Sequence, residues 1–97
     1  MDNARSLPSV RAMTRHDLEA WLDHHLDQSV LVEWHSLYGG EVAEKISRTG
    51  VLRKENGGYM AGEALIDLTD FETADFENEG VVVELGKENV ELYIALS

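Results

Sequence analysis

The stretch VLRKENGGYM, residues 51–60, constrains the fold most, because it predicts a tight reversal between two strands. Asn56 and Gly57 lie between segments in which apolar and polar residues alternate. A type I′ turn needs positive φ at both central positions, and Asn-Gly meets that need best. A phosphate-binding loop would need a helix directly after the glycines and a Lys-Ser/Thr pair, and neither is present. The stretch therefore predicts a β-hairpin.

The pattern of the rest of the chain predicts one helix followed by further strands. Thr14 is a good N-cap with Asp17 three residues on, and the apolar residues that follow recur at helical spacing up to Asp27. Residues 41–49 fit a helical turn or a strand, and we favour a strand from about residue 45, bent at Gly50. The five predicted strands cover residues 29–35, 45–55, 59–68, 80–85 and 89–96.

This order predicts an α+β, mainly β fold: an N-terminal amphipathic helix followed by a five-stranded antiparallel small barrel. A chain of 97 residues fits one domain. Residues 1–13 lack periodicity before the cap, so we expect a flexible N-terminal arm there and a single helix-plus-barrel domain over residues 14–97.

Two stretches resemble the motifs of the Sm-like family, whose small barrel is of the SH3 type. Gly50-Val51-Leu52 with Tyr59-Met60 resembles the first motif, and GKENVELYI, residues 86–94, resembles the second. The aspartate of the first motif falls on Asn56, and the uridine-binding residues of the family are missing. The resemblance therefore implies the fold and no binding residue, because fold alone does not define function.

The net charge of −11 narrows the classes of partner. It repels nucleic acids and anionic membranes at long range. It fits a solvated surface, a halophile's protein, or an acidic mimic that blocks a DNA- or RNA-handling enzyme. The sequence contains no cysteine, no apolar run long enough to span a membrane and no secretory signal, so we expect a cytoplasmic protein.

Charge is segregated along the chain. The acidic segment DLTDFETADFENE, residues 67–79, contains two aromatic residues that could anchor a protein partner while the carboxylates steer it. A basic spot precedes it and offers the contacts for an anion or nucleic acid. The predicted partner-binding residues are Phe71, Phe76, Asp70, Glu72, Asp75 and Glu77, and the basic spot comprises Lys45, Arg48, Arg53 and Lys54.

The sequence contains no clear motif for metal binding or catalysis. His25 falls on the apolar arc of the helix, which predicts a partly buried structural histidine. A metal site from His16, Glu19 and Asp23 lacks any strict ligand motif. The acidic segment lacks the spacing and glycine of a calcium loop. No nucleophile elbow or catalytic triad spacing is present. We therefore predict no catalytic residues, no cofactor and no metal.

Three functions remain as hypotheses. The leading one is a small non-catalytic binding module that recognises another protein or a second copy of itself. The second is a nucleic-acid-mimic inhibitor, which needs carboxylates spaced like phosphates along one face. The third is an Sm-like RNA-binding protein of a halophile, which would use the basic spot and bind RNA only in a high-salt host.

Overall fold

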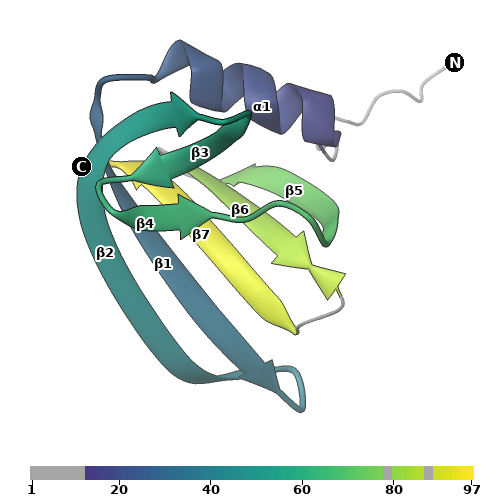
Figure 1. The fold of residues 1–97 in the computed structure, drawn as a ribbon. Helices are drawn as coiled ribbons and strands as arrows, with labels where there is room; N and C mark the ends of the chain where they lie inside the picture. The colour runs from purple at the N-terminus through teal and green to yellow at the C-terminus, as the bar shows by residue number, and fades with distance from the viewer. Residues whose placement is uncertain (1–12, 78–79, 87–88) are drawn as a thin grey trace, which may run out of the picture.

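The computed structural model describes residues 13–77, 80–86 and 89–97, which form one helix and a seven-stranded antiparallel sheet (Figure 1). The strand order across the sheet is β4-β3-β2-β1-β7-β6-β5. The elements are α1 (Arg15–His24), β1 (Ser29–Tyr38), β2 (Glu41–Glu55), β3 (Gly58–Ala61), β4 (Ala64–Ile66), β5 (Phe71–Glu77), β6 (Gly80–Leu85) and β7 (Val90–Leu96).

The sheet is rolled but does not close into the predicted five-stranded barrel. Its two outermost strands, β4 and β5, are consecutive in the chain, and the five residue steps from Ile66 to Phe71 span at most roughly 18 Å. The short connection holds the two edges near each other, while no strand pairing joins β4 to β5 among the described residues. The mainly β class is confirmed, whereas the strand count and the closure are wrong.

The predicted helix is confirmed, although it ends earlier than expected. Thr14 caps it through a reciprocal pair of hydrogen bonds with Asp17, in which each backbone N–H donates to the other side chain. The helix ends at His24, and Asp27 then adopts a φ of 71° as the chain turns into β1. Leu18 and Leu22 are fully buried against the sheet, so α1 covers one end of the rolled sheet (Figure 1).

Residues 41–55 form the single long strand β2, which settles the helix-or-strand ambiguity in favour of a strand. Its hairpins with β1 and β3 turn through Gly39-Gly40 and Asn56-Gly57, and all four residues have positive φ as the Asn-Gly signal predicted. The first part of β2 pairs with β1, and its last four residues pair with β3. β2 therefore connects the β3–β4 hairpin to the strands from β1 to β5 in the sheet.

The predicted strand over residues 59–68 is wrong because the chain reverses inside it. Gly62 has a φ of 61°, and Gly62-Glu63 forms a two-residue turn that pairs Ala61 with Ala64. The insertion of this turn also changes which side chains are buried. Tyr59 and Ala61 lie in the core, whereas Met60 between them is only partly buried.

The acidic segment, most of which falls between two predicted strands, forms a strand itself. Residues 71–77 form β5, an edge strand that pairs along its length with β6. Ala74 points into the core, and the neighbouring carboxylates of Asp75 and Glu77 are exposed. This alternation stabilises the strand although the segment is acidic. The predicted last hairpin is confirmed, with Val81 opposite Ile94 and Val83 opposite Leu92, all fully buried.

Met13, the last residue of the predicted arm, belongs to the core. It is 5% exposed, and its N–H donates to the carbonyl of Ala74 at 2.7 Å, which forms a β-bridge to β5. Residues 1–12 lie outside the described part of the chain, so the mobility predicted for the arm stays a prediction.

A polar contact ties the helix to the β2–β3 hairpin. The hydroxyl of Tyr59 donates to Oδ1 of Asp23 at 2.7 Å, and Nζ of Lys54 donates to the same oxygen at 3.3 Å. These bonds, led by the one from Tyr59, hold the pKa of Asp23 below its ordinary value. The carboxylate of Asp23 therefore ties the helix to the hairpin through two hydrogen bonds.

Gly50→Ala is expected to destabilise the fold by about 1–3 kcal/mol, the usual cost of overpacking. A Cβ at Gly50 would lie 2.5 Å from the backbone nitrogen of Gly62, and a backbone atom cannot move aside cheaply. Gly58→Ala is the matched control, because its nearest new contact is 3.7 Å. Chemical denaturation of both variants measures the difference, and equal losses would contradict the close approach at Gly50.

Tyr59→Phe is expected to raise the pKa of Asp23 towards its ordinary value, because it removes the strongest hydrogen bond to the carboxylate. A carboxyl whose folded pKa lies below its unfolded pKa stabilises the fold above the unfolded value and loses that contribution as pH falls through the folded value. The variant should therefore lose less stability on acidification. NMR titration of the Asp23 carboxyl checks this, with Tyr93→Phe as control; an unchanged pKa in Tyr59→Phe would contradict it.

Candidate protein-binding surfaces

The two aromatic residues of the acidic segment have different environments. A bulge between Phe71 and Thr73 places Phe71 opposite Leu85, on the core side of β5, where it is partly buried. Phe76 lies opposite Val81 at the end of the strand and is 64% exposed. Of the two predicted anchors, Phe76 alone presents most of its ring to solvent.

The acidic residues around them do not form one face. Asp75 and Glu77 are exposed and alternate with Ala74 and Phe76, so they lie on the opposite side of β5 from the exposed ring. Glu72 lies by Gly86 at the bulge. Asp70 lies in the connection that precedes the strand. The structure thus separates the predicted anchor from the charges that were expected to steer a partner to it.

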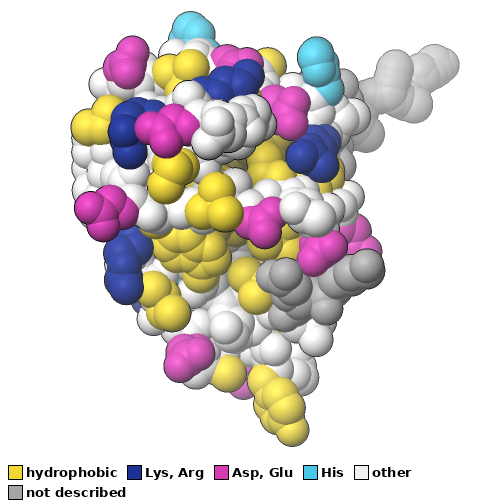
Figure 2. Space-filling view, in the orientation of Figure 1, with side chains coloured by type: hydrophobic (Ala, Val, Ile, Leu, Met, Phe, Trp, Pro, Cys, Tyr) yellow, Lys and Arg dark blue, Asp and Glu magenta, His cyan; other side chains and the backbone are white. Residues whose placement is uncertain are grey.

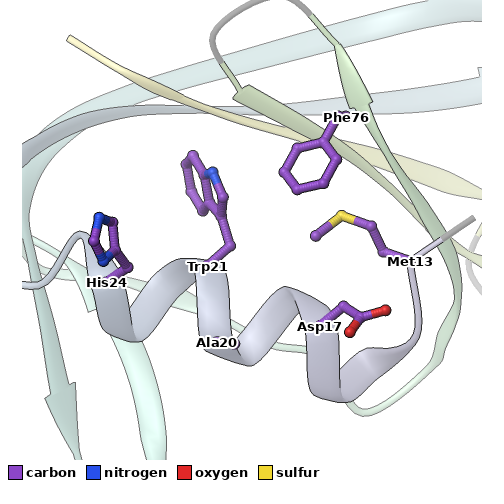
Figure 3. A pocket seen from close by; sticks show the side chains of 6 residues that line it. All are labelled: Met13, Asp17, Ala20, Trp21, His24 and Phe76. Carbon is purple, nitrogen blue, oxygen red and sulfur yellow. The ribbon is translucent and has the colours of Figure 1, made fainter.

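Phe76 instead contributes to a groove of about 350 Å³ between α1 and β5. Figure 3 shows its ring and that of Trp21 directed into the same space, with Met13 beside them. Asp17, Ala20 and His24 complete the lining along the helix. The groove is mostly apolar, and a partner's side chain could lie in it.

Two histidines at the end of the helix lie at or next to this groove: His24 lines it, and His25 contacts Trp21. His25 caps the C-terminus of α1, its ring contacts that of Trp21 at 4.5 Å between centroids, and its Nδ1 lies 3.2 Å from Oε1 of Gln28. The ring is half-buried, as expected for a partly buried structural histidine.

The weighed metal ligands are not brought together. Glu19 pairs with Arg15 at 3.2 Å, and Asp23 is engaged by Tyr59 and Lys54. Within the described residues, no three His, Asp or Glu side chains are gathered in a way that could hold a metal ion. Nor does any helix of that part of the chain have the length and apolar character needed to cross a membrane.

The basic spot is divided between the two faces of β2. Its alternation with the buried Leu52 places Arg48 and Lys54 on the inner face and Lys45 and Arg53 on the outer face. Arg53 pairs with Glu55 at 2.9 Å, and Lys54 pairs with Asp23. A phosphate backbone would therefore meet no single cluster of these four cations.

The outer face of β1 carries a separate charged contact. Nε2 of His35 lies 3.0 Å from Oε1 of Glu33, and its Nδ1 lies 3.5 Å from Oε1 of Glu91 on β7. The hydrogen bond with His35 is the main cause of the lowered pKa of Glu33. This contact joins neighbouring strands on the convex side of the rolled sheet.

An apolar cleft of about 440 Å³ opens at the end of the sheet that α1 does not cover. Figure 2 shows hydrophobic side chains gathered in the middle of this face. Ile46 in the cleft wall is 47% exposed although it faces inward. The cleft is lined by Trp34, Ser36, Ile46, Arg48, Ala64, Asp67, Leu85 and Val90.

One wall of this cleft is a free strand edge. β3 pairs only with residues 52–55 of β2, so residues 41–49 have a strand partner on the β1 side alone among the described residues. The N–H of Leu52 donates towards the β1 side, to Gln28, while the carbonyl of Val51 accepts from Gly62 on the other side. By the same alternation, Lys45, Ser47 and Thr49 turn their backbone N–H and C=O groups outward.

Sequence interpretation missed this surface. The predicted closed barrel has no unpaired edge beside Trp34 and Ile46, so no surface was expected there. The signal that marks the opening is Gly62, because the turn it forms shortens β3 and leaves the preceding part of β2 unpaired.

Comparisons with protein-family models, with curated proteins and with solved structures found no match. The resemblance to the Sm-like family therefore stays an interpretation of two short stretches. The open seven-stranded sheet also differs from the five-stranded barrel that the resemblance implied.

An apolar dye such as anilinonaphthalene sulfonate is expected to bind this cleft, because it exposes aromatic and aliphatic side chains to solvent. Ile46→Asp should reduce the dye fluorescence severalfold, since it places a charge in the wall. Phe76→Asp is the control that alters the helix groove instead and should reduce it less. The reverse order of the two effects would show that the dye prefers the helix groove.

Proposed function

We propose that this protein is a small, acidic, non-catalytic protein-binding module of the cytoplasm. The observation that carries the proposal is the free edge of β2 beside the apolar cleft. An extended segment of a partner could add to the edge as a strand and place alternate side chains over the cleft. Backbone hydrogen bonds would then supply affinity, and the cleft would supply selectivity.

The energetics of the edge support strand addition. Three outward residues, Lys45, Ser47 and Thr49, have backbone donors and acceptors that no strand of the described residues pairs with. Unpaired edges of this kind are usually blocked by charged side chains, proline, bulges or a covering element, and Lys45 is the charged residue among the outward three. A bulge is present near Ser36 and Leu37, at the tip of the hairpin, while the stretch from Glu44 to Thr49 keeps regular pairing with β1.

The other hypotheses receive less support. The four cations of the basic spot lie on two different faces of β2, and Arg53 and Lys54 are paired with acidic residues. This arrangement disfavours RNA binding by an Sm-like surface. Mimicry of nucleic acid needs carboxylates on one face, and the exposed acids of β5 are split between its bulge and its outer face. Self-association, in which the acidic segment of one copy contacts the basic spot of another and Phe71 or Phe76 anchors the contact, stays a prediction.

Ser47→Pro is expected to abolish the binding of extended peptides selected from a random display library. It removes an outward N–H while leaving the hydrogen bonds to β1 in place. Ser47→Ala is the matched control, because it keeps the N–H and should bind as the parent protein does. Circular dichroism must show that both variants fold, and NMR shifts of labelled protein should centre on Lys45, Ser47 and Thr49.

Two results would overturn the proposal. One is a selection that yields no extended peptide. The other is a set of peptides that bind Ser47→Pro as tightly as the parent protein, since strand addition requires the edge N–H.

A further inference from the structure

The inner face of the free edge carries three different side chains in a fixed order. Glu44, Ile46 and Arg48 lie opposite Ser36, Trp34 and Val32 of β1, so they share the side of the sheet that faces the cleft. Read along β2, their order is acidic, apolar, basic. Ile46 and Arg48 also line the cleft itself.

From this order we infer the sequence class of the partner segment: acidic–x–apolar–x–basic, bound antiparallel to β2. The inference rests on the proposed function. An antiparallel segment meets Arg48 first, then Ile46, then Glu44, so each of its alternate side chains faces a complementary one. These three positions are non-hydrogen-bonded sites of the new pair, where opposite side chains approach most closely.

The direction of the segment follows from the existing sheet. β3 pairs with the same edge of β2 and is antiparallel to it. A segment that continues the line of β3 therefore runs antiparallel as well, and such pairs are the more stable ones. A parallel segment would require the reversed order, basic–x–apolar–x–acidic.

Arg48 is positioned to respond to such a segment. Its guanidinium donates to the carbonyl of Ser47 at 2.8 Å, which is one of the outward carbonyls of the edge. An incoming N–H would take over that carbonyl and release the guanidinium. The released group could then pair with the acidic residue of the segment, which lies opposite it.

A second copy of the chain has the matching order on its own β2 but does not fit the opening. With Ile46 opposite its counterpart, the other copy's Glu41 would lie beside Val51, and its turn would follow beside Leu52. That part of the edge is already occupied, because Gly62 bonds to Val51 and Ala61 pairs with Leu52. A separate extended segment can instead leave the edge at Thr49.

The test compares two dye-labelled peptides of equal composition, TETLTKT and TKTLTET, by fluorescence anisotropy with the full chain. The first should bind about tenfold more tightly, because two opposite-charge pairs replace two like-charge pairs. The double variant Glu44→Arg/Arg48→Glu should reverse the preference. As a control for altered charge elsewhere, Glu84→Arg on β6 should keep it.

The outcomes separate the two ideas. Equal binding of both peptides overturns the acidic–x–apolar–x–basic order, and so does a preference that survives the charge swap. If Ser47→Pro still abolishes binding of these peptides, the proposed protein-binding function stands. No binding of either peptide, or binding unaffected by Ser47→Pro, overturns both. Peptides N-methylated at their central threonines give the same answer without altering the protein. A dimer that Ser47→Pro dissociates would overturn the separate segment in favour of a second copy.

Discussion

The close approach of Gly50 to Gly62 is the contact on which the rest of the structure depends. It lies where β2 leaves its pairing with β1 alone and begins its pairing with β3. Because neither residue has a side chain, the backbone of the β3–β4 turn can lie directly against the bend in β2. The contact holds the short β3–β4 hairpin beside residues 50–55 of β2. Residues 41–49 of β2 are left without a second strand partner among the described residues.

The opening explains why an apolar cleft persists in so acidic a protein. A closed barrel of this size would be filled by its own side chains. Here the helix fills one end with Leu18 and Leu22, and no element among the described residues covers Trp34 and Ile46 at the other. The charges lie mainly on the convex face, on β5 and along the helix, so the concave face is the part of the surface suited to an apolar contact.

Several elements could be predicted from the sequence because their causes are local. The cap at Thr14, the helical spacing after it and the Asn56-Gly57 turn each depend on a few neighbouring residues. The last hairpin was predicted from two segments with apolar residues at alternate positions on either side of a turn. The break at Gly62 was missed because the apolar alternation continues across it, and only the pairing of Ala61 with Ala64 shows the reversal.

The sequence by itself determined the helix, the mainly β class, the Asn56-Gly57 turn and the net charge, since these follow from local dihedral preferences, periodicity and composition. Tertiary structure decided which edges stay unpaired, which of Phe71 and Phe76 is exposed, and how the cations of β2 divide between two faces. The physical reason is that strand pairing joins residues far apart in the chain. A single two-residue turn or bulge in one strand therefore changes the side of the sheet on which every later side chain lies.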